Sequence, residues 1–190
     1  MVKMTPPHTK RVQQWARELF ERPNFYIIDT ETTGIGKQDE VVQIGIVDKH
    51  GAVVLNTLVK AHVPISPKAS QVNGITDDML QDAPPLSDLY VTLSSALAGR
   101  PLVAYNMPFD WRMLEQSFGK AGLPIFRSGP RHCAMRQYAQ FRGQRNAYGN
   151  GYRWFSLSEA CRQQRIQAVN THTAVGDSLL TLELIKRMAD

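Results

Sequence analysis

The sequence contains few cysteines and no long apolar run. Its 190 residues include two cysteines, Cys133 and Cys161, whose spacing fits no structural metal site. We therefore expect buried free thiols rather than a disulfide. No apolar stretch approaches the roughly 20 residues that span a membrane, and residues 1–7 lack the apolar core of a signal peptide. These features predict a cytoplasmic protein without a membrane partner.

Acidic residues are nearly absent from residues 127–165, where Glu159 is the single acid. The same stretch holds Arg127, Arg131, Arg136, Arg142, Arg145, Arg153, Arg162 and Arg165. The net charge of +5 and the pI near 9.4 are suited to an anionic polymer as partner. A basic surface that is only solvated is the alternative.

The chain shows no repeat and no low-complexity segment, and a hydrophobic content of 43% is typical of a globular protein. We divide it into an N-terminal extension, residues 1–23, and a main domain, residues 24–190. Residues 9–22 carry apolar side chains at helical spacing, which predicts an amphipathic helix. We expect this helix to pack on the domain; docking to a partner or to a second copy is the alternative.

Patterns along the main domain predict alternating strands and helices. Strands are expected near residues 24–30, 41–48 and 52–60, the third after a turn at His50 and Gly51. Prolines then punctuate a connector with short helices. A helix near 86–98, a strand at 101–105, a helix near 109–121 and a short edge strand near 131–134 follow.

The most informative run is residues 25–34, an apolar strand that ends in two carboxylates. Asp29 and Glu31 occupy alternate positions, so both project from one face of the strand. Neighbouring acids on a core strand repel each other and lose hydration, so they need a compensating charge. A divalent cation with oxygen ligands supplies such a charge. Taken alone, the pair could also be solvated acids before a turn.

Two further segments carry polar groups next to predicted helix starts. Asn106 and Pro108 mark a helix whose first turn includes Asp110, where the helix dipole favours a carboxylate. His172 and Asp177 lie about 140° apart on an ideal helix, so they cannot converge from its middle. We expect His172 at or before the start of the last helix, with Asp177 pointing into the same site. Each segment alone is also compatible with surface or capping residues.

Together the three segments resemble the DnaQ-like, DEDDh-type 3′–5′ exonuclease family. The matching motifs are Asp29-x-Glu31 with Thr32-Thr33-Gly34, Asn106-x-x-Phe109-Asp110, and His172-x-Ala174-x-x-Asp177. The resemblance spans about residues 24–189. A sister subfamily carries Tyr four residues before the last Asp, where this chain has Thr173, so the histidine subclass is expected.

The resemblance implies an α/β ribonuclease H-like fold, with a five-stranded mixed sheet flanked by helices. It also implies a catalytic site of Asp29, Glu31, Asp110, Asp177 and His172, in which the four carboxylates hold two Mg²⁺ or Mn²⁺ ions. By the same analogy Asp29 bridges the ions, Glu31 and Asp177 hold the first, and Asp110 acts through water at the second. Histidine titrates near neutrality, so His172 is the expected general base.

The expected substrate-binding residues surround these acids. They are Thr30, Thr32, Thr33, Asn73, Asn106 and Phe109. The chain departs from the family pattern at Gln43, where Glu is common, and at Asn73, where His is common. Gln43 retains hydrogen bonding, so we expect metal binding to persist. Asn73 lies on a loop that borders the terminal-nucleotide pocket in relatives, so it affects nucleotide contacts.

Residues 141–155 interleave Arg, Gly and aromatic residues, a composition suited to backbone contact and base stacking on single strands. The alternative is a surface loop, with a small hairpin around Asn150 and Gly151 and with Trp154 and Phe155 in the core. Ser156 and Glu159 then form a capping box that starts the next helix.

We therefore expect a metal-dependent 3′–5′ exonuclease that acts on single-stranded or frayed 3′ ends, releases nucleoside 5′-monophosphates and favours DNA. The rival enzyme is an exoribonuclease that trims short RNA or tRNA ends. The non-enzymatic rival is a nucleic-acid-binding module that has lost catalysis. A polymerase or repair partner is compatible with the sequence, which does not define the oligomeric state.

Overall fold

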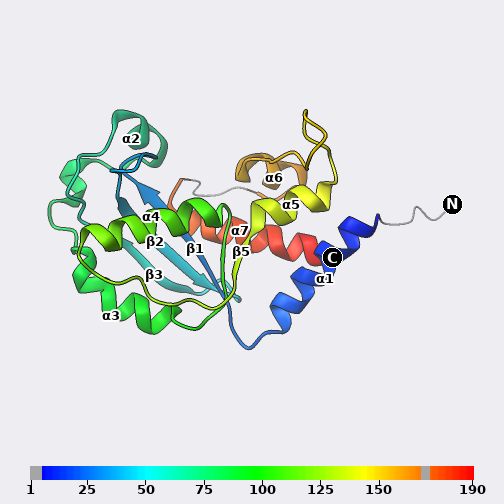
Figure 1. Cartoon of the computed structure of the whole chain (residues 1–190), viewed down its shortest axis with the longest axis horizontal. Helices are drawn as coiled ribbons and strands as arrows, with labels where there is room; N and C mark the ends of the chain where they lie inside the picture. The colour runs from blue at the N-terminus through cyan, green and yellow to red at the C-terminus, as the bar shows by residue number, and fades with distance from the viewer. Residues whose placement is uncertain (1–5, 168–171) are drawn as a thin grey trace.

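The computed structural model describes residues 6–167 and 172–190, and these form a five-stranded mixed sheet covered by helices on both faces (Figure 1). The strands are β1 (Tyr26–Thr32), β2 (Val41–Asp48), β3 (Val53–Leu58), β4 (Leu102–Ala104) and β5 (Arg131–Cys133). Their order is β3-β2-β1-β4-β5. The first three strands form an antiparallel meander, and β4 and β5 run parallel to β1. The expected fold class is confirmed.

Side chains of β1 alternate between two hydrophobic cores. Ile27 packs with α1, α5, α6 and α7, whereas Ile28 packs on the opposite face with α3 and α4. The helices are α1 (Pro7–Glu21), α2 (Pro67–Asn73), the 3₁₀ helix η1 (Asp77–Leu80), α3 (Leu86–Leu97), α4 (Met107–Lys120), α5 (Ala134–Arg142), α6 (Leu157–Gln163) and α7 (Ala174–Ala189). None of the described helices is both long and apolar enough to cross a membrane.

Helix α1 packs against the body of the protein. Val12, Ala16 and Leu19 are buried in the same core as Ile27, and α1 contacts α5 and α7. The side of α1 that the sequence marks as apolar is thus covered within the chain. The division at residues 23 and 24 stays a prediction.

Several details differ from the expectations. Strand β1 extends to Thr32, so both of its acids lie within the strand rather than at its end. Under the surface-loop alternative for residues 141–155, both Trp154 and Phe155 lie in the core; Phe155 is buried, but Trp154 is 62% exposed. In extended chain, neighbouring side chains face opposite ways, so one of the two had to face solvent. Both cysteines are free, but only Cys161 is buried; Cys133 is half-buried on the edge strand β5.

Gly45 on β2 permits the closest approach between the sheet and α7. A Cβ atom at this position would lie 2.3 Å from the carbonyl carbon of Ala174 and from the nitrogen of Val175. Both atoms belong to the backbone of the first turn of α7, which cannot move independently of the helix. The missing side chain therefore brings the start of α7 onto the sheet.

Replacing Gly45 by Ala should push the start of α7 away from β2. We expect a loss of about 1–3 kcal/mol in the free energy of unfolding, the usual cost of overpacking. Denaturant unfolding monitored by circular dichroism measures this loss. The control is Gly119→Ala on α4, where an added Cβ meets open space and should stabilise the helix by about 0.4–1 kcal/mol. Equal stability of the two variants would contradict the proposed close packing.

Candidate active site

Three carboxylates converge at the C-terminal half of β1. Asp29 and Glu31 project from this strand, and Asp177 approaches from the first turn of α7. One oxygen of each carboxylate lies within 4.8 Å of an oxygen of the other two, and all three residues are half-buried. The alternation along β1 and the close packing at Gly45 together bring these acids into one cluster.

Asp110 joins the site from the other side of β1. It lies in the first turn of α4, which begins after Asn106 and carries Pro108 at its start, as the sequence predicts. The backbone N–H and the hydroxyl of Thr30 donate hydrogen bonds to Oδ1 of Asp110 at 3.1 and 2.9 Å. Asp110 is 3% exposed. Thr30 therefore orients this carboxylate beside Asp29.

His172 immediately precedes the cap of α7. The Thr173 hydroxyl accepts a hydrogen bond from the Gly176 N–H at 3.1 Å, so Thr173 rather than His172 caps the helix. The His172 backbone has φ = 65°, a conformation uncommon outside glycine, and its N–H donates to Oδ1 of Asp177 at 3.4 Å. Its side chain borders the cavity that holds the acids. The described part of the neighbouring loop ends at residue 167.

Gln43 supports the start of α7. Its side-chain oxygen accepts a hydrogen bond from the Ala174 N–H at 3.1 Å, and its amide nitrogen donates to Asn56 at 3.3 Å. Glu at this position would accept the same bond from Ala174 but could not donate to Asn56. The departure from the family pattern therefore retains the contact that positions the start of α7.

A cavity of about 180 Å³ contains the full set of predicted catalytic residues. It is lined by Asp29, Thr30, Glu31, Val72, Tyr105, Asn106, Phe109, Asp110, Leu157, His172 and Asp177. No lysine or arginine is among these described lining residues. Among the described residues, the wall of this cavity therefore brings no permanent cation to the acids.

Burial raises the pKa of every acid in the cluster, and repulsion between carboxylates adds to the rise for Asp29, Glu31 and Asp110. Burial raises the pKa of Asp29 well above its usual value, and Asp110, Asp177 and Glu31 add to the rise. Burial, together with repulsion from Asp177, raises the pKa of Glu31 to about 7. Burial likewise raises the pKa of Asp110, although its hydrogen bonds from Thr30 oppose the rise, and that of Asp177. The folded chain therefore holds these protons more tightly than an unfolded chain does.

A second cavity of about 260 Å³ adjoins the first and shares Thr30, Glu31, Val72 and Phe109 with it. The other lining residues are Thr32, Gly34, Ile35, Ser66, Lys68, Ala69 and Asn73. Asn73 donates a hydrogen bond to the Thr32 carbonyl at 3.3 Å and accepts one from the Ile75 N–H at 3.0 Å. A further hydrogen bond from Asn73 lowers the pKa of Glu31. Asn73 thus couples the two cavities.

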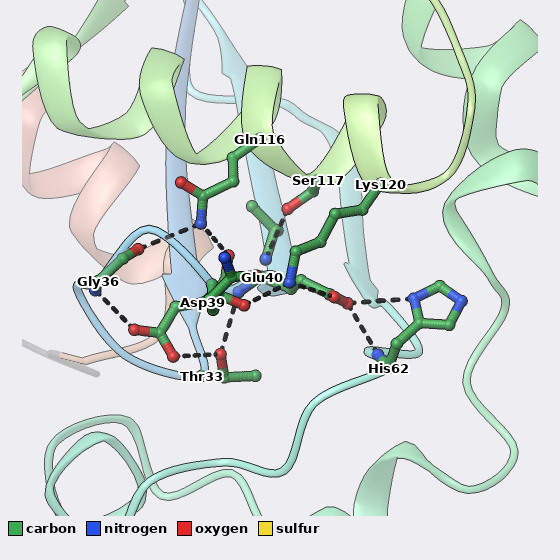
Figure 2. Close-up of polar contacts among 10 residues, drawn as sticks. Thr33, Gly36, Asp39, Glu40, His62, Gln116, Ser117 and Lys120 are labelled. Atoms are coloured by element: carbon green, nitrogen blue, oxygen red, sulfur yellow. Dashed lines mark hydrogen bonds and ion pairs between the residues drawn. The ribbon is translucent and has the colours of Figure 1, made fainter.

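A buried polar network holds the loop between β1 and β2 against α4 (Figure 2). The Glu40 carboxylate accepts hydrogen bonds from the His62 N–H at 2.7 Å and from Lys120 at 3.0 Å. Burial raises the pKa of Glu40, but these bonds outweigh it and hold the pKa below its usual value. Gln116 and Lys120 also donate to loop carbonyls of Asp39 and Gln38. Hydrogen bonds from α4 therefore hold the loop that borders the second cavity.

Thr33 belongs to this network rather than to either cavity. It is fully buried, its hydroxyl donates to Asp39 at 2.9 Å, and its backbone N–H donates to the Glu40 carbonyl at 2.8 Å. The structure brings the other predicted substrate-binding residues to a cavity wall. Thr33 instead supports the loop that ends β1.

The sequence interpretation missed the apolar wall of the second cavity. Ile35 and Val72 are 77% and 53% exposed, and both line it. Arg112 lies 5.4 Å from the centre of the Phe109 ring and donates to the Ile35 carbonyl at 3.2 Å. An isoleucine between Gly34 and Gly36, directly after the acidic strand, was the available signal, because an apolar side chain in a glycine turn has no core to enter.

Comparison with known proteins gives a consistent result. The exonuclease family RNase T, described as "Exonuclease", matches residues 26–185. The chain therefore belongs to this family of exonucleases, and the expected DnaQ-like relationship is confirmed. It is 34% identical over 184 residues to the uncharacterized exonuclease CP81 of Escherichia phage 186, covering 94% of each chain. It is 30% identical over 182 residues to DNA polymerase III subunit epsilon of Treponema pallidum, covering 93% of this chain and 81% of the relative.

Solved structures agree with the fold. Exonuclease X in complex with 5′ overhanging duplex DNA is 28% identical, has a TM-score of 0.62, and is matched over 86% of this chain and 90% of that one. Exonuclease I of Escherichia coli in a complex with single-stranded DNA has a TM-score of 0.69 at 17% identity, over 85% of this chain and 39% of that one. The latter likeness concerns the fold alone.

The donor set suits divalent metal ions, which exonucleases of this family generally use. Carboxylate oxygens are the ligands that Mg²⁺ and Mn²⁺ prefer. The Asp29, Glu31 and Asp177 oxygens are close enough to share an ion, and the raised pKa values indicate uncompensated negative charge.

The raised pKa values predict a pH-dependent response to metal. An acid whose pKa is raised on folding destabilises the folded state once the unfolded acid ionises, here from about 4 up to about 7 for Glu31. With chelator present, the melting temperature should fall as pH rises through this interval. Added Mn²⁺ should raise it more at about pH 8 than at about pH 5, because protons then compete less.

Asp29→Asn should raise the melting temperature in chelator and reduce the gain from Mn²⁺. The control is Asp82→Asn, which removes an exposed acid outside the cavity. A gain from Mn²⁺ that is equal in the Asp29→Asn variant and in the wild type would place the metal elsewhere.

Proposed function

We propose that the protein is a metal-dependent 3′–5′ exonuclease that releases nucleoside 5′-monophosphates from single-stranded or frayed 3′ ends, with DNA favoured over RNA. The single observation that carries this proposal is the convergence of four carboxylates and one histidine in a single cavity. The relationship to an epsilon subunit of DNA polymerase III and the likeness to exonuclease X with bound DNA support it.

The four acids have a common role in this proposal. Asp29, Glu31 and Asp177 would hold one divalent ion, and Asp110 would contribute to a second on the α4 side of β1. Two such ions neutralise charge on the attacking and leaving oxygens of a phosphodiester. Thr30 keeps the Asp110 carboxylate in place through two hydrogen bonds, so the acid does not have to be ordered when substrate arrives.

His172 is proposed to accept the proton of the attacking water. It borders the acidic cavity, is exposed, and is the histidine among the lining residues. Its backbone is tied to Asp177, which also belongs to the acidic cluster. A neutral imidazole can accept a proton from water and release it to solvent.

The second cavity is proposed to receive the terminal nucleoside. Ile35, Val72 and Phe109 offer apolar surface to a base or sugar, and Asn73 and Ser66 add polar groups. The cavity adjoins the acids, so a nucleoside bound there would place its phosphate at the cluster. This arrangement suits an enzyme that acts at a chain end.

Oligonucleotides of DNA and RNA, labelled at either end, test this function directly. In the presence of Mn²⁺, DNA labelled at the 3′ end should release labelled mononucleotide at once. DNA labelled at the 5′ end should give a ladder of labelled strands that shorten stepwise. RNA of the same sequence should react more slowly; a faster reaction would favour the exoribonuclease alternative. The Asp29→Ala variant should be inactive, and near-normal turnover by that variant would place the reaction at another site.

The His172→Ala variant should lower kcat by about 10²–10⁴-fold, the usual contribution of a general base. The melting temperature should change little, because the Thr173 hydroxyl caps α7. In the wild type, kcat should rise with pH through a group that titrates near neutrality.

The matched control is Thr173→Ala, which removes the cap and should cost about 1 kcal/mol of stability. If His172→Ala loses stability like the cap variant and keeps its kcat, His172 is a structural residue.

Association with a polymerase is a further proposal, supported by the relationship to an epsilon subunit, and co-purification with a replicative DNA polymerase would test it.

A further inference from the structure

The loop of residues 144–154, between α5 and α6, contributes no residue to the walls of the catalytic cavity. It projects from the side of the molecule away from α2 and α3 (Figure 1). A cavity of about 820 Å³ lies within it, lined by Gln144, Arg145, Asn146, Ala147, Tyr148, Asn150, Gly151, Tyr152, Arg153 and Trp154. The lining is aromatic, basic and amide-rich, and it contains no acid.

The loop holds its shape through its own hydrogen bonds. Arg145 and Tyr152 form an antiparallel bridge, and the Asn146 N–H donates to the Gly151 carbonyl at 3.0 Å. Gly149 turns the chain with φ = 69°. The small hairpin around Asn150 and Gly151, which belongs to the surface-loop alternative, is thus present. A preformed loop loses little conformational entropy when a ligand binds.

Two aromatic rings of this loop are left in solvent. Tyr148 is 88% exposed and Trp154 is 62% exposed, and no other aromatic residue in the described part of the chain is classed as exposed. Tyr152, by contrast, is half-buried. The centre of its ring lies 5.8 Å from the centre of the His8 ring and 5.2 Å from the guanidinium carbon of Arg145. Tyr152 therefore takes part in the packing of the loop itself, whereas the rings of Tyr148 and Trp154 face solvent.

Charge around the rings favours a polyanion. Arg142, Arg145 and Arg153 are exposed, and the nearest acid in sequence, Glu159, is already paired with Arg153 at 2.9 Å. Exposed Tyr and Trp residues also occur at protein–protein interfaces. The side chains of Asn146 and Asn150 hydrogen-bond to each other at 2.9 Å and so support the loop. The surplus of cations and the exposed amide of Gln144 favour phosphates and base edges instead.

The chain connects this loop directly to the acidic cavity. Leu157, the first residue of α6, lines that cavity and follows Trp154 by three residues. Three residues span at most about 11 Å, so the base of the loop lies within the reach of a few nucleotides from the acids. A strand whose 3′ end occupies the site can therefore extend toward the loop.

We infer that the 144–154 loop is a second binding site for single-stranded nucleic acid, which stacks bases on Tyr148 and Trp154 and binds phosphate through Arg145. This inference rests on the proposed function, because it assigns the loop to the strand upstream of the reacting 3′ end. The loop would hold long substrates and leave the shortest ones unaffected.

Fluorescence anisotropy of the full chain in chelator tests the inference without hydrolysis. The probe is single-stranded DNA of about 16 nucleotides, the upper size that a single-strand-binding fold covers. Tyr148→Ala and Trp154→Ala should each weaken binding by between about 5-fold and 100-fold, the usual loss of one stacked base. Tyr148→Phe should bind as the wild type does, and Val91→Ala, which removes an exposed apolar residue of α3, is the control.

Arg145→Ala should lower the slope of log affinity against log salt by about 0.7, the value for one phosphate of a single strand. Arg127→Ala, an exposed arginine of the loop between α4 and β5, is its control. The inference would be overturned if Tyr148→Ala and Trp154→Ala both kept the wild-type affinity, or if they lost as much affinity for a blunt duplex as for the single strand. The two exposed rings would then be assigned to a protein partner.

Turnover separates this inference from the proposed function. With Mn²⁺, Tyr148→Ala should raise KM on the long strand and leave kcat and KM on a dinucleotide as in the wild type. If the wild type hydrolyses neither substrate, the proposed function fails, whereas the anisotropy measurement still decides the binding site. An equal rise in KM on both substrates would mean that the variant disturbs the catalytic cavity, and would overturn the inference.

Discussion

Repulsion among four carboxylates gathered around one buried strand is the constraint around which this structure is organised. The free acids are costly, because burial raises the pKa of each of them and repulsion adds to the rise for Asp29, Glu31 and Asp110. The fold offsets part of that cost with backbone dipoles. Asp110 and Asp177 each lie in the first turn of a long helix, α4 and α7, where the positive end of the dipole stabilises negative charge. A helix dipole contributes about 0.3–1 kcal/mol at an exposed site and up to about 2 kcal/mol at a partly buried one, so bound cations can compensate the charge that remains.

Bringing two helix starts to one strand requires close packing from both faces of the sheet. On one face, Gly45 lets the backbone of α7 approach β2, and Gln43 accepts a hydrogen bond from Ala174 at the first residue of that helix. On the other face, Thr30 binds Asp110 from within β1. The same strand thus supplies Asp29 and Glu31 to the site and positions a third acid through the residue between them. Substitutions at Gly45 or Thr30 should act on the site without contacting any ligand.

Much of this arrangement was accessible from the sequence, because local patterns dictate it. The alternation around Asp29 and Glu31 required a strand with both acids on one face, and Asn106 with Pro108 required a helix start before Asp110. What the sequence could not provide were contacts between distant segments with no periodic signal. The hydrogen bond from the Ala174 N–H to Gln43 is one example, and the apolar wall that joins Ile35 to Val72 is another. Trp154 and Phe155 have similar hydrophobicity, so composition alone could not decide which of them faces the core.

The network behind the second cavity explains how an exposed loop can border a site of fixed shape. Asp39 accepts hydrogen bonds from Thr33 and from the Gly36 N–H, and Glu40 connects the same loop to Lys120 on α4 (Figure 2). These bonds lie on the protein side of the loop, so the cavity side keeps its apolar surface for a ligand. The bonds to Glu40 hold its pKa below the usual value, whereas burial raises the pKa of Glu31 to about 7. The carboxylate that supports the cavity is therefore charged at the pH at which Glu31 takes up its proton.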